Sequence, residues 1–302
     1  MRDVLFLITS ACLLSAATFR PPKLGYIYDP DAAAIRVISG VSGAAAVEET
    51  VATGSKLAFA AVAPGARYAL VRLRDAAGVS VLQFDSGSMS ALDGASATGD
   101  LIAFSAGAAS AAIWTGERIQ VWTGLPESPA LARELAAEEV TALAVADDAA
   151  AVAASTRTGT LLWEGSDSAR ALAPAAALVF VPGSHDLVVA EESGNRLSAI
   201  RGAETDVLAT EKDGIAGAVA LAIASDGRTL AVANANGGSV AVVNLSTHEV
   251  GVTQCDCTPR ELLALSGDRL FALRAANGGV RLLDAGRGEL SLFLLSPAGG
   301  ER

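Results

Sequence analysis

The sequence predicts an all-β fold in which a unit of four short strands, about 41 residues long, is repeated seven times along the chain. The clearest unit is Gly217–His248, which reads as three β-strands separated by Asp226-Gly227 and by Asn236-Gly237-Gly238. Asp-Gly and Asn-Gly pairs supply the positive φ angles that tight hairpin turns require. One such meander cannot bury its apolar faces alone. The number and the period of its repeats therefore indicate the architecture.

Two markers recur at the same interval. Third strands start at Ile35, Val79, Ile119, Leu161, Leu197, Val240 and Val280, so successive starts lie 36 to 44 residues apart. Turns before the second strands fall at Pro64-Gly65, Ala106-Gly107, Asp147-Asp148, Pro182-Gly183, Asp226-Gly227 and Gly267-Asp268. Four short strands with a period near 41 residues are typical of a β-propeller blade. Seven third strands therefore predict a seven-bladed β-propeller.

Fourth strands are expected at Ala45–Val51, Met89–Asp93, Ala130–Leu135, Ala169–Ala173, Asp206–Thr210, Val250–Gln254 and Glu289–Leu295. No clear first strand precedes Leu24, because the segment TFRPPK is short and holds two prolines. This leaves 27 expected strands, one fewer than seven full blades. We therefore expect the N-terminal blade to be built from residues 23–53 alone and to be held by packing, without a strand from the C-terminus.

Composition agrees with blades that are buried on both faces. Such strands read as nearly continuous apolar runs, and the mean hydropathy is +0.42. Expected first strands are rich in alanine, which suits the crowded centre of a ring. The segment Ser128–Ser155 has a helix-like content of Ala, Leu and Glu. Its apolar positions hold no helical stripe beyond Leu135, so the repeat predicts strands there.

The N-terminus carries an apolar run, Val4–Ala17, that is too short to span a membrane and has the length of a signal-peptide core. Ser15-Ala16-Ala17 supplies the small residues that signal peptidase prefers. We expect cleavage near Ala17, export to the periplasm or the extracellular space, and a single propeller domain over 24–302. A lipoprotein anchored through Cys12 is the alternative.

The net charge of −11 bears on partners. A chain this acidic does not attract the negatively charged phosphates of nucleic acid or of anionic lipid. The repeats leave no gap for a second domain, and we expect a monomer.

The residues AIASDGRTLAVANANGGSVAVVNLSTHEV resemble the repeat of bacterial YVTN-type and related seven-bladed propeller proteins. In that repeat a strand ending in Ser-x-Asp-Gly leads to Leu-x-Val-Ala-Asn and then to Val-x-Val. The segment GDRLFALRAANGGVRLLD is a fair match, and elsewhere only the strand pattern remains. The Trp-Asp pairs of the WD40 class are absent, since Thr123 follows Trp122 and Glu164 follows Trp163. The resemblance implies the fold, export and a binding role, and it carries over no functional residue.

Candidate chemical groups are few. Both histidines, His185 and His248, fall in expected turns, where a solvated side chain is the simpler interpretation than a ligand or a general base. Carboxylates also gather in turns, and Asp29-Pro30-Asp31 is the one short cluster that a calcium site could use. Nucleophile-elbow, P-loop and dinucleotide motifs are absent. The sequence assigns no catalytic, cofactor-binding or metal-binding residue, and it implies no cofactor.

Beyond Cys12 the chain holds two cysteines, Cys255 and Cys257, between a fourth strand and the next first strand. In an oxidising compartment two leftover cysteines usually pair. Residues two apart can do so only where the backbone bends, and Thr258-Pro259 would provide such a bend. A structural disulfide, two unpaired thiols and a working redox motif all remain open.

Two functional hypotheses follow. In the first, an exported, non-enzymatic propeller uses its loops to bind a protein, a peptide or a glycan. In the second, a lactonase-like propeller hydrolase or lyase has its site at the mouth of the central channel. Such an enzyme needs a ring of polar side chains where the first strands end, and the expected ends are Ala, Ser, Pro and Gly. The first hypothesis is favoured, and the side chains that line the channel would discriminate between the two.

Overall fold

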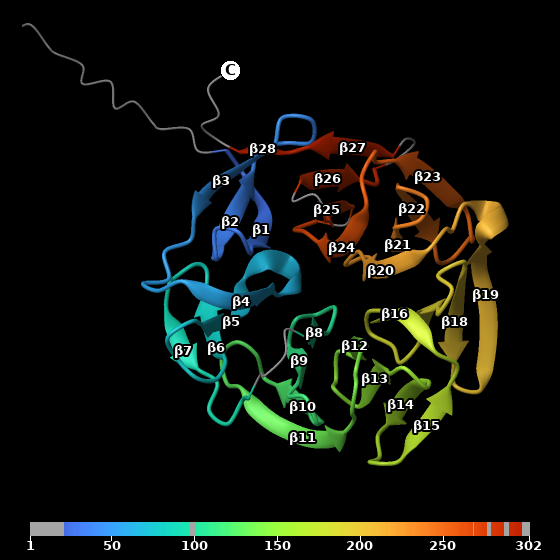
Figure 1. Cartoon of the computed structure of the whole chain (residues 1–302), viewed down its shortest axis with the longest axis horizontal. Helices are drawn as coiled ribbons and strands as arrows, with labels where there is room; N and C mark the ends of the chain where they lie inside the picture. The colour runs from blue at the N-terminus through green and yellow to red at the C-terminus, as the bar shows by residue number, and fades with distance from the viewer. Residues whose placement is uncertain (1–20, 97–100, 268, 277–278, 287–289, 298–302) are drawn as a thin grey trace, which may run out of the picture.

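The computed structural model describes residues 21–96, 101–267, 269–276, 279–286 and 290–297. The expected signal peptide at 1–17 and Cys12 lie outside these residues. Within them, seven four-stranded sheets form a ring around a central channel (Figure 1). The fold class is therefore confirmed as a seven-bladed β-propeller. No helix in this part of the chain is long and apolar enough to cross a membrane.

Six blades have the same topology, in which four consecutive antiparallel strands run outward from the channel. They are numbered here as blades 2 to 7. Their strands are β4 (Leu57–Val62), β5 (Tyr68–Leu73), β6 (Ser80–Gln83) and β7 (Met89–Ala91); β8 (Ile102–Phe104), β9 (Ser110–Trp114), β10 (Arg118–Thr123) and β11 (Ala130–Ala136); β12 (Ala142–Val145), β13 (Ala151–Ser155), β14 (Thr160–Glu164) and β15 (Ala169–Leu172); β16 (Ala175–Phe180), β17 (Leu187–Glu191), β18 (Arg196–Arg201) and β19 (Glu204–Thr210); β20 (Ala218–Ile223), β21 (Thr229–Asn234), β22 (Ser239–Asn244) and β23 (Val250–Gln254); β24 (Pro259–Ala264), β25 (Leu270–Ala275), β26 (Val280–Asp284) and β27 (Ser291–Leu294).

The segment with a helix-like composition is entirely extended where it is structured. It forms β11, β12 and β13, and all five side chains of β13 are buried. Packing between blades therefore overrides the helix propensity of alanine and leucine, as the repeat predicted. Two single-turn 3-10 helices, η1 (Pro64–Ala66) and η2 (Glu211–Asp213), are the helical elements of the described chain.

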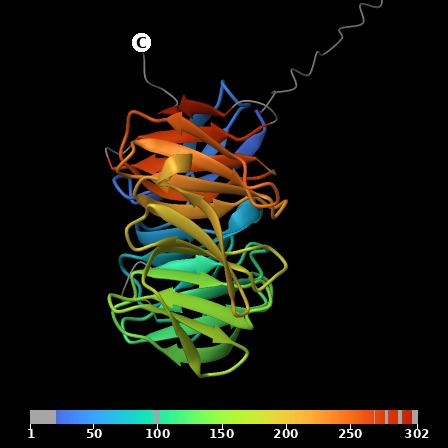
Figure 2. The same cartoon turned by 90° about the vertical axis from the view of Figure 1, so that its right-hand side faces the viewer.

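The core is divided among the interfaces between blades. Each of the seven interfaces holds its own apolar cluster, made of residues from the two blades that meet there. Figure 2 shows the ring from its side, with neighbouring sheets stacked face to face around it. Because each blade contributes to two clusters, its strands are apolar on both faces, which accounts for the high mean hydropathy.

The N-terminal blade, blade 1, consists of β1 (Lys23–Asp29), β2 (Ala34–Ser39), β3 (Ala46–Thr50) and β28 (Ser296–Pro297). Hydrogen bonds to blade 2 show which position, from the channel outward, each strand of blade 1 takes. In blade 6, the first residue of the inner strand, Ala218, donates its N–H to Gly194 in the turn that follows the second strand of blade 5. In blade 2 the corresponding residue, Leu57, donates to Ala33, which lies in the turn after β1. β1 therefore occupies the place of a second strand.

The position of an inner strand in blade 1 is not filled by any residue that the structure describes. The downstream turn of blade 2 covers part of this space, because η1 lies against both β1 and β24 of blade 7. We call the rest of the space the inner slot. It is bounded by β1, β4 and β24.

The closure of the ring differs from the expectation. The outer strand of blade 7 is β27, as predicted from Glu289–Leu295, but the chain does not end there. It continues into β28, where Ser296 and Pro297 pair in parallel with Ala46 and Val47 of β3 (Figure 1). The expectation that blade 1 lacks a strand from the C-terminus was therefore wrong. Two residues after a fourth strand were too short a segment to be recognised in the sequence.

Candidate functional site

A cavity lies in the central channel, where the inner strands of the blades meet. It has a volume of about 270 Å³ and is lined by residues from all seven blades. Its wall is almost entirely aliphatic and aromatic, and it includes Ala60, Ala103, Val145, Val179 and Leu221. We call the end where β4, β8, β12, β16, β20 and β24 begin the upstream end, and the opposite end the downstream end. The sequence placed small apolar residues here because inner strands crowd together, and the wall agrees with that reasoning.

Polar side chains occur in the channel wall at the upstream end. They are Tyr28, Glu261 and Arg274. Arg274 pairs with Glu261, and the exposed fractions of these side chains are 29% and 54%. A second guanidinium nitrogen of Arg274 donates to the Tyr28 carbonyl at 3.3 Å, and the Tyr28 hydroxyl donates to the Ala58 carbonyl at 3.1 Å. The three groups thus tie blade 7 to blade 1 and blade 1 to blade 2.

The inner slot opens into the same cavity. In five blades, second-strand residues are shielded from the channel by the inner strand. Second-strand positions line the cavity in two places, which are Ala272 and Arg274 of β25 and Ile27 and Tyr28 of β1. Both places border the slot, which no described residue fills.

The downstream end carries a cluster of turns from three blades. The Asp147 carboxylate accepts the Gly107 N–H at 2.6 Å and the Gly183 N–H at 2.8 Å, while its backbone carbonyl accepts the Ser110 hydroxyl at 3.0 Å. Asp147 therefore bridges blades 3, 4 and 5. The sequence places Asp147 in a turn and does not indicate this bridge. Only an alignment of the turns that follow the first strands of adjacent repeats could have singled out Asp147 as a bridging residue.

Both histidines are in the turns that the sequence predicted. His185 lies with Nε2 at 3.0 and 3.1 Å from the two carboxylate oxygens of Asp148, and both side chains are about half exposed. The Ala150 N–H, followed by His185, lowers the pKa of Asp148 below its usual range. His248 is exposed in the turn before β23 and has a φ of 60°. The two histidines belong to separate blades and do not converge on one site.

The Asp29-Pro30-Asp31 cluster forms a local turn. One Asp29 oxygen accepts the N–H groups of Asp31 and Ala32, and the other accepts from Arg36 at 3.5 Å. These contacts keep the Asp29 carboxylate within the turn and the strand that follows it. No group of three or more His, Cys, Asp or Glu side chains in the described ranges is arranged to hold a metal.

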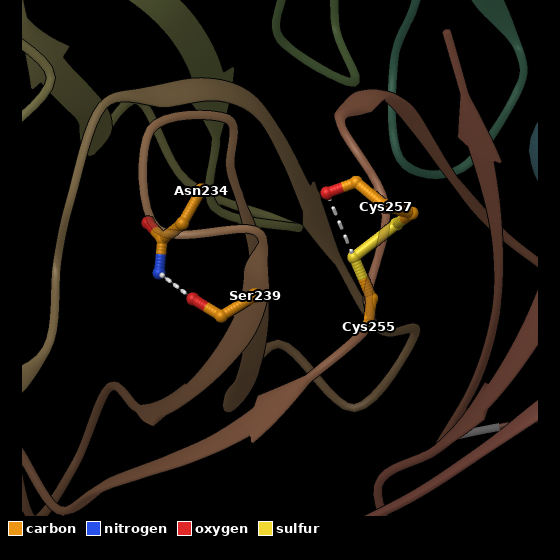
Figure 3. The surroundings of a disulfide bond; sticks show 4 residues. All are labelled: Asn234, Ser239, Cys255 and Cys257. Atoms are coloured by element: carbon orange, nitrogen blue, oxygen red, sulfur yellow. Dashed lines mark hydrogen bonds between the residues drawn. A yellow bond between two sulfur atoms is a disulfide. The ribbon is translucent and has the colours of Figure 1, made fainter. Parts of the chain in front are cut away.

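Cys255 and Cys257 are bonded to each other, with their Cα atoms 5.1 Å apart (Figure 3). The bend between them comes from Asp256, whose φ of 47° is left-handed. Cys255 is buried in the cluster between blades 6 and 7. Its sulfur lies 3.4 Å from the Cys257 carbonyl oxygen, a contact that becomes a hydrogen bond only when the pair is reduced and the thiol can donate. The bonded pair corresponds to the first of the three alternatives left open by the sequence.

No protein-family model matches the chain, and no curated protein matches it. Solved structures do. The chain is similar to the structure of U3-55K (15% identity over 80% of this chain and 81% of that chain, TM-score 0.58) and to the crystal structure of the RRP9 WD40 repeats (16% identity over 80% of each chain, TM-score 0.59). It is also similar to the β-propeller domain of Cps50 (Swd1) from Myceliophteria thermophila, with 15% identity over 66% of this chain and 71% of that chain and a TM-score of 0.51.

At these identities the likeness shows the fold alone. The chain is a seven-bladed β-propeller whose structural neighbours include WD40-repeat proteins. The specific resemblance to YVTN-type repeats stays a prediction.

Proposed function

We propose that this protein is an exported, non-enzymatic propeller that serves as a binding scaffold for another macromolecule. The observation that carries the proposal is the wall of the central channel. Acid–base, nucleophilic or metal-assisted chemistry requires several polar groups that converge on one reacting atom. In the described wall, Arg274 and Glu261 are paired with each other, and the Tyr28 hydroxyl bonds to a backbone carbonyl.

The alternative, a lactonase-like hydrolase or lyase, is testable at the same place. Purified protein would be assayed against a panel of lactones and esters, together with the variants Glu261→Gln and Arg274→Gln. We expect no turnover above the uncatalysed rate for any of the three proteins. Turnover by the parent chain that is lost in both variants would contradict the scaffold proposal and support the enzyme.

Binding is tested by crosslinking in the native cells. The tagged full chain is expected to yield one or a few reproducible partners that a tagged propeller of similar size and charge does not yield. Recovery of the same proteins by both baits would contradict a scaffold function.

Export rests on the apolar run Val4–Ala17 and the small residues at its end. The exported protein is expected to begin near Thr18, as read by N-terminal sequencing. An exported chain that retains Met1, or that carries a lipid on Cys12, would contradict this part of the proposal.

A further inference from the structure

The disulfide between Cys255 and Cys257 lies in the short connection between blades 6 and 7. β23 ends at Gln254 and β24 starts at Pro259, so residues 255–258 make up the whole connection. They lie at the upstream end of the ring, where β24 begins. The bond is part of the folded structure, and its surroundings indicate that it can also react there.

Hydrogen bonds hold both ends of this connection independently of the sulfur atoms. The Cys255 N–H donates to the Gly238 carbonyl at 2.9 Å, in the turn between β21 and β22 of blade 6. The Thr258 carbonyl accepts the Ala276 N–H at 2.9 Å, from the residue that follows β25 of blade 7. Pro259 is buried at the start of β24. Opening the disulfide therefore leaves both ends of the connection in place, and the two blades can stay packed.

The loop that the disulfide closes is very short, because a single residue separates the two cysteines. In the chain-entropy account, a cross-link stabilises a protein by restricting the unfolded chain, and the effect increases with the length of the closed loop. A loop of this length restricts the unfolded chain little. The fold therefore does not depend strongly on the bond.

The backbone between the two cysteines has an uncommon conformation. Asp256 has a φ of 47°, in the left-handed region, where the Cβ atom of an L residue crowds the following carbonyl oxygen. Aspartate tolerates this region better than most residues and still prefers a negative φ. When the bond opens, Asp256 is free to adopt a negative φ. Relief of this backbone strain favours the reduced form of the pair.

The two sulfur atoms differ in their access to solvent. Cys255 is 6% exposed and belongs to the apolar cluster between blades 6 and 7. Cys257 is only partly buried, and it lies between the exposed residues Asp256 and Thr258. A thiolate from solvent therefore reaches Cys257 more easily. The Cys257 carbonyl oxygen, 3.4 Å from the Cys255 sulfur, is in place to accept a hydrogen bond from the Cys255 thiol once the bond has opened (Figure 3).

We propose that Cys255 and Cys257 form a thiol–disulfide exchange site for an exposed dithiol, in which Cys257 is the sulfur that is attacked. One thiolate of the dithiol bonds to Cys257 Sγ, and the bond between Cys257 and Cys255 breaks. Its electron pair passes to Cys255 Sγ, which takes a proton from water. This inference goes beyond the scaffold function and does not depend on it.

The second step completes the exchange. The other thiolate of the dithiol attacks the sulfur that is bonded to Cys257, so that the mixed disulfide breaks and Cys257 Sγ takes a proton from water. The dithiol is thereby oxidised to a disulfide, and the cysteine pair of the propeller is reduced to two thiols. Each chain oxidises one dithiol, so the reaction is stoichiometric.

The first test asks whether the bond reacts in the folded chain. The exported protein is treated at about pH 8, near the pKa of a thiol, with dithiothreitol or with a reduced Cys-Ala-Ala-Cys peptide. The series runs from no urea to a urea concentration just below the unfolding transition. Mass spectrometry counts the alkylated thiols in the peptide that spans both cysteines. Reaction of both probes identifies the dithiol itself as the group that reacts, and reaction of the peptide alone restricts the site to protein dithiols.

We expect the rate of reduction to change by less than about twofold over the urea series, because attack on the native bond requires no unfolding. A rate that increases by about tenfold or more, in step with the unfolding equilibrium, would overturn the proposal.

A pair of variants tests which sulfur is attacked. Cys255→Ser leaves the thiol of Cys257, and Cys257→Ser leaves the buried thiol of Cys255. Each variant is treated with cystamine, and we expect the mixed disulfide to form at least about tenfold faster on Cys257, which is the more accessible thiol. Equal rates, or a faster reaction of Cys255, would contradict the assigned order. If either variant fails to fold, the acid-trapped mixed disulfide of the parent chain identifies the attacked sulfur directly.

Hydrogen exchange separates a reactive site from a fastener of the ring. In the reduced protein the N–H groups of Cys255 and Ala276 should keep their carbonyl partners, so their exchange rates should stay within about threefold of those in the oxidised protein. If reduction instead makes exchange about tenfold faster throughout β24 and β25, the disulfide holds the two blades together and the proposal is wrong.

Discussion

At the scale of single residues, Asp147 is the turn carboxylate whose hydrogen bonds connect three blades. Replacing it with alanine removes acceptors for the N–H groups of Gly107 and Gly183, which belong to the two neighbouring blades. Both glycines are exposed and can turn to water, so Asp147→Ala should cost about 1–2 kcal/mol of unfolding free energy. Urea unfolding at pH 7 measures the change.

The matched control is the adjacent carboxylate. Asp148→Ala loses a contact with Ala150 in its own turn and a half-exposed contact with His185, so it should cost less than about 1 kcal/mol. Equal losses from the two variants would mean that Asp147 does not act as a bridge between blades.

Asp148 also gives a prediction about pH. Its pKa is lowered in the folded state, first by the Ala150 N–H and then by His185. The stabilisation is therefore present above the unfolded pKa of about 3.9 and is lost as the pH falls through the lower folded pKa. NMR titration of the carboxyl carbon should place the midpoint of Asp148 below about 3.9.

His185→Ala should raise this midpoint only part of the way, because the Ala150 N–H remains. A midpoint that is unchanged in the variant would show that the imidazole does not contribute. As the pH falls below about 4, the variant Asp148→Asn should lose less stability than the parent chain.

Cys255 and Cys257 supply a chemical prediction. The exported protein, denatured without reductant, should take up no iodoacetamide. After reduction it should take up two groups, both in the peptide that spans the two residues, because its other cysteine, Cys12, lies in the segment that we expect export to remove. Alkylation before reduction would instead support the alternative of unpaired thiols.

At the scale of elements, β28 is the strand that joins the two ends of the chain. Removing residues 296–302 leaves β3 without its outer neighbour, so amide exchange in Ala46–Thr50 should become faster than in the parent chain. Removing 298–302 alone leaves the two paired residues in place and serves as the control. If both truncations behave alike, the parallel pairing does not hold blade 1.

For the whole molecule, we expect a monomer. The six large apolar side chains that are exposed in the described structure are Val41, Leu131, Val207, Val219, Val252 and Leu294. They are distributed over several blades, and scattered exposed apolar residues do not form an oligomer interface. Light scattering coupled to size exclusion should give the monomer mass over a wide range of concentration. A mass that rises with concentration would point to a surface shared between copies of the chain.

The sequence by itself determined the architecture of this protein. Its repeat is carried by local signals, which are turn residues such as Asp226-Gly227 and short apolar runs, and each acts within a few residues of the chain. Third strands from Val79 onward lie where the spacing placed them, and so do the fourth strands from Met89 onward. The repeat also identified strands in Ser128–Ser155, where local propensity alone favoured a helix.

Only the tertiary structure decided the features that depend on which blades meet. Ser296 and Pro297 form a strand because β3 lies beside them, although nothing in their own sequence favours one. Glu261 faces Arg274 because the pairing of β24 with β25 shifts register after Pro259. Asp147 reaches two glycines that lie 40 and 36 residues away in the chain. A propeller is specified by short-range patterns, whereas its closure, its channel wall and its inner slot arise from contacts between distant repeats, which local patterns do not encode.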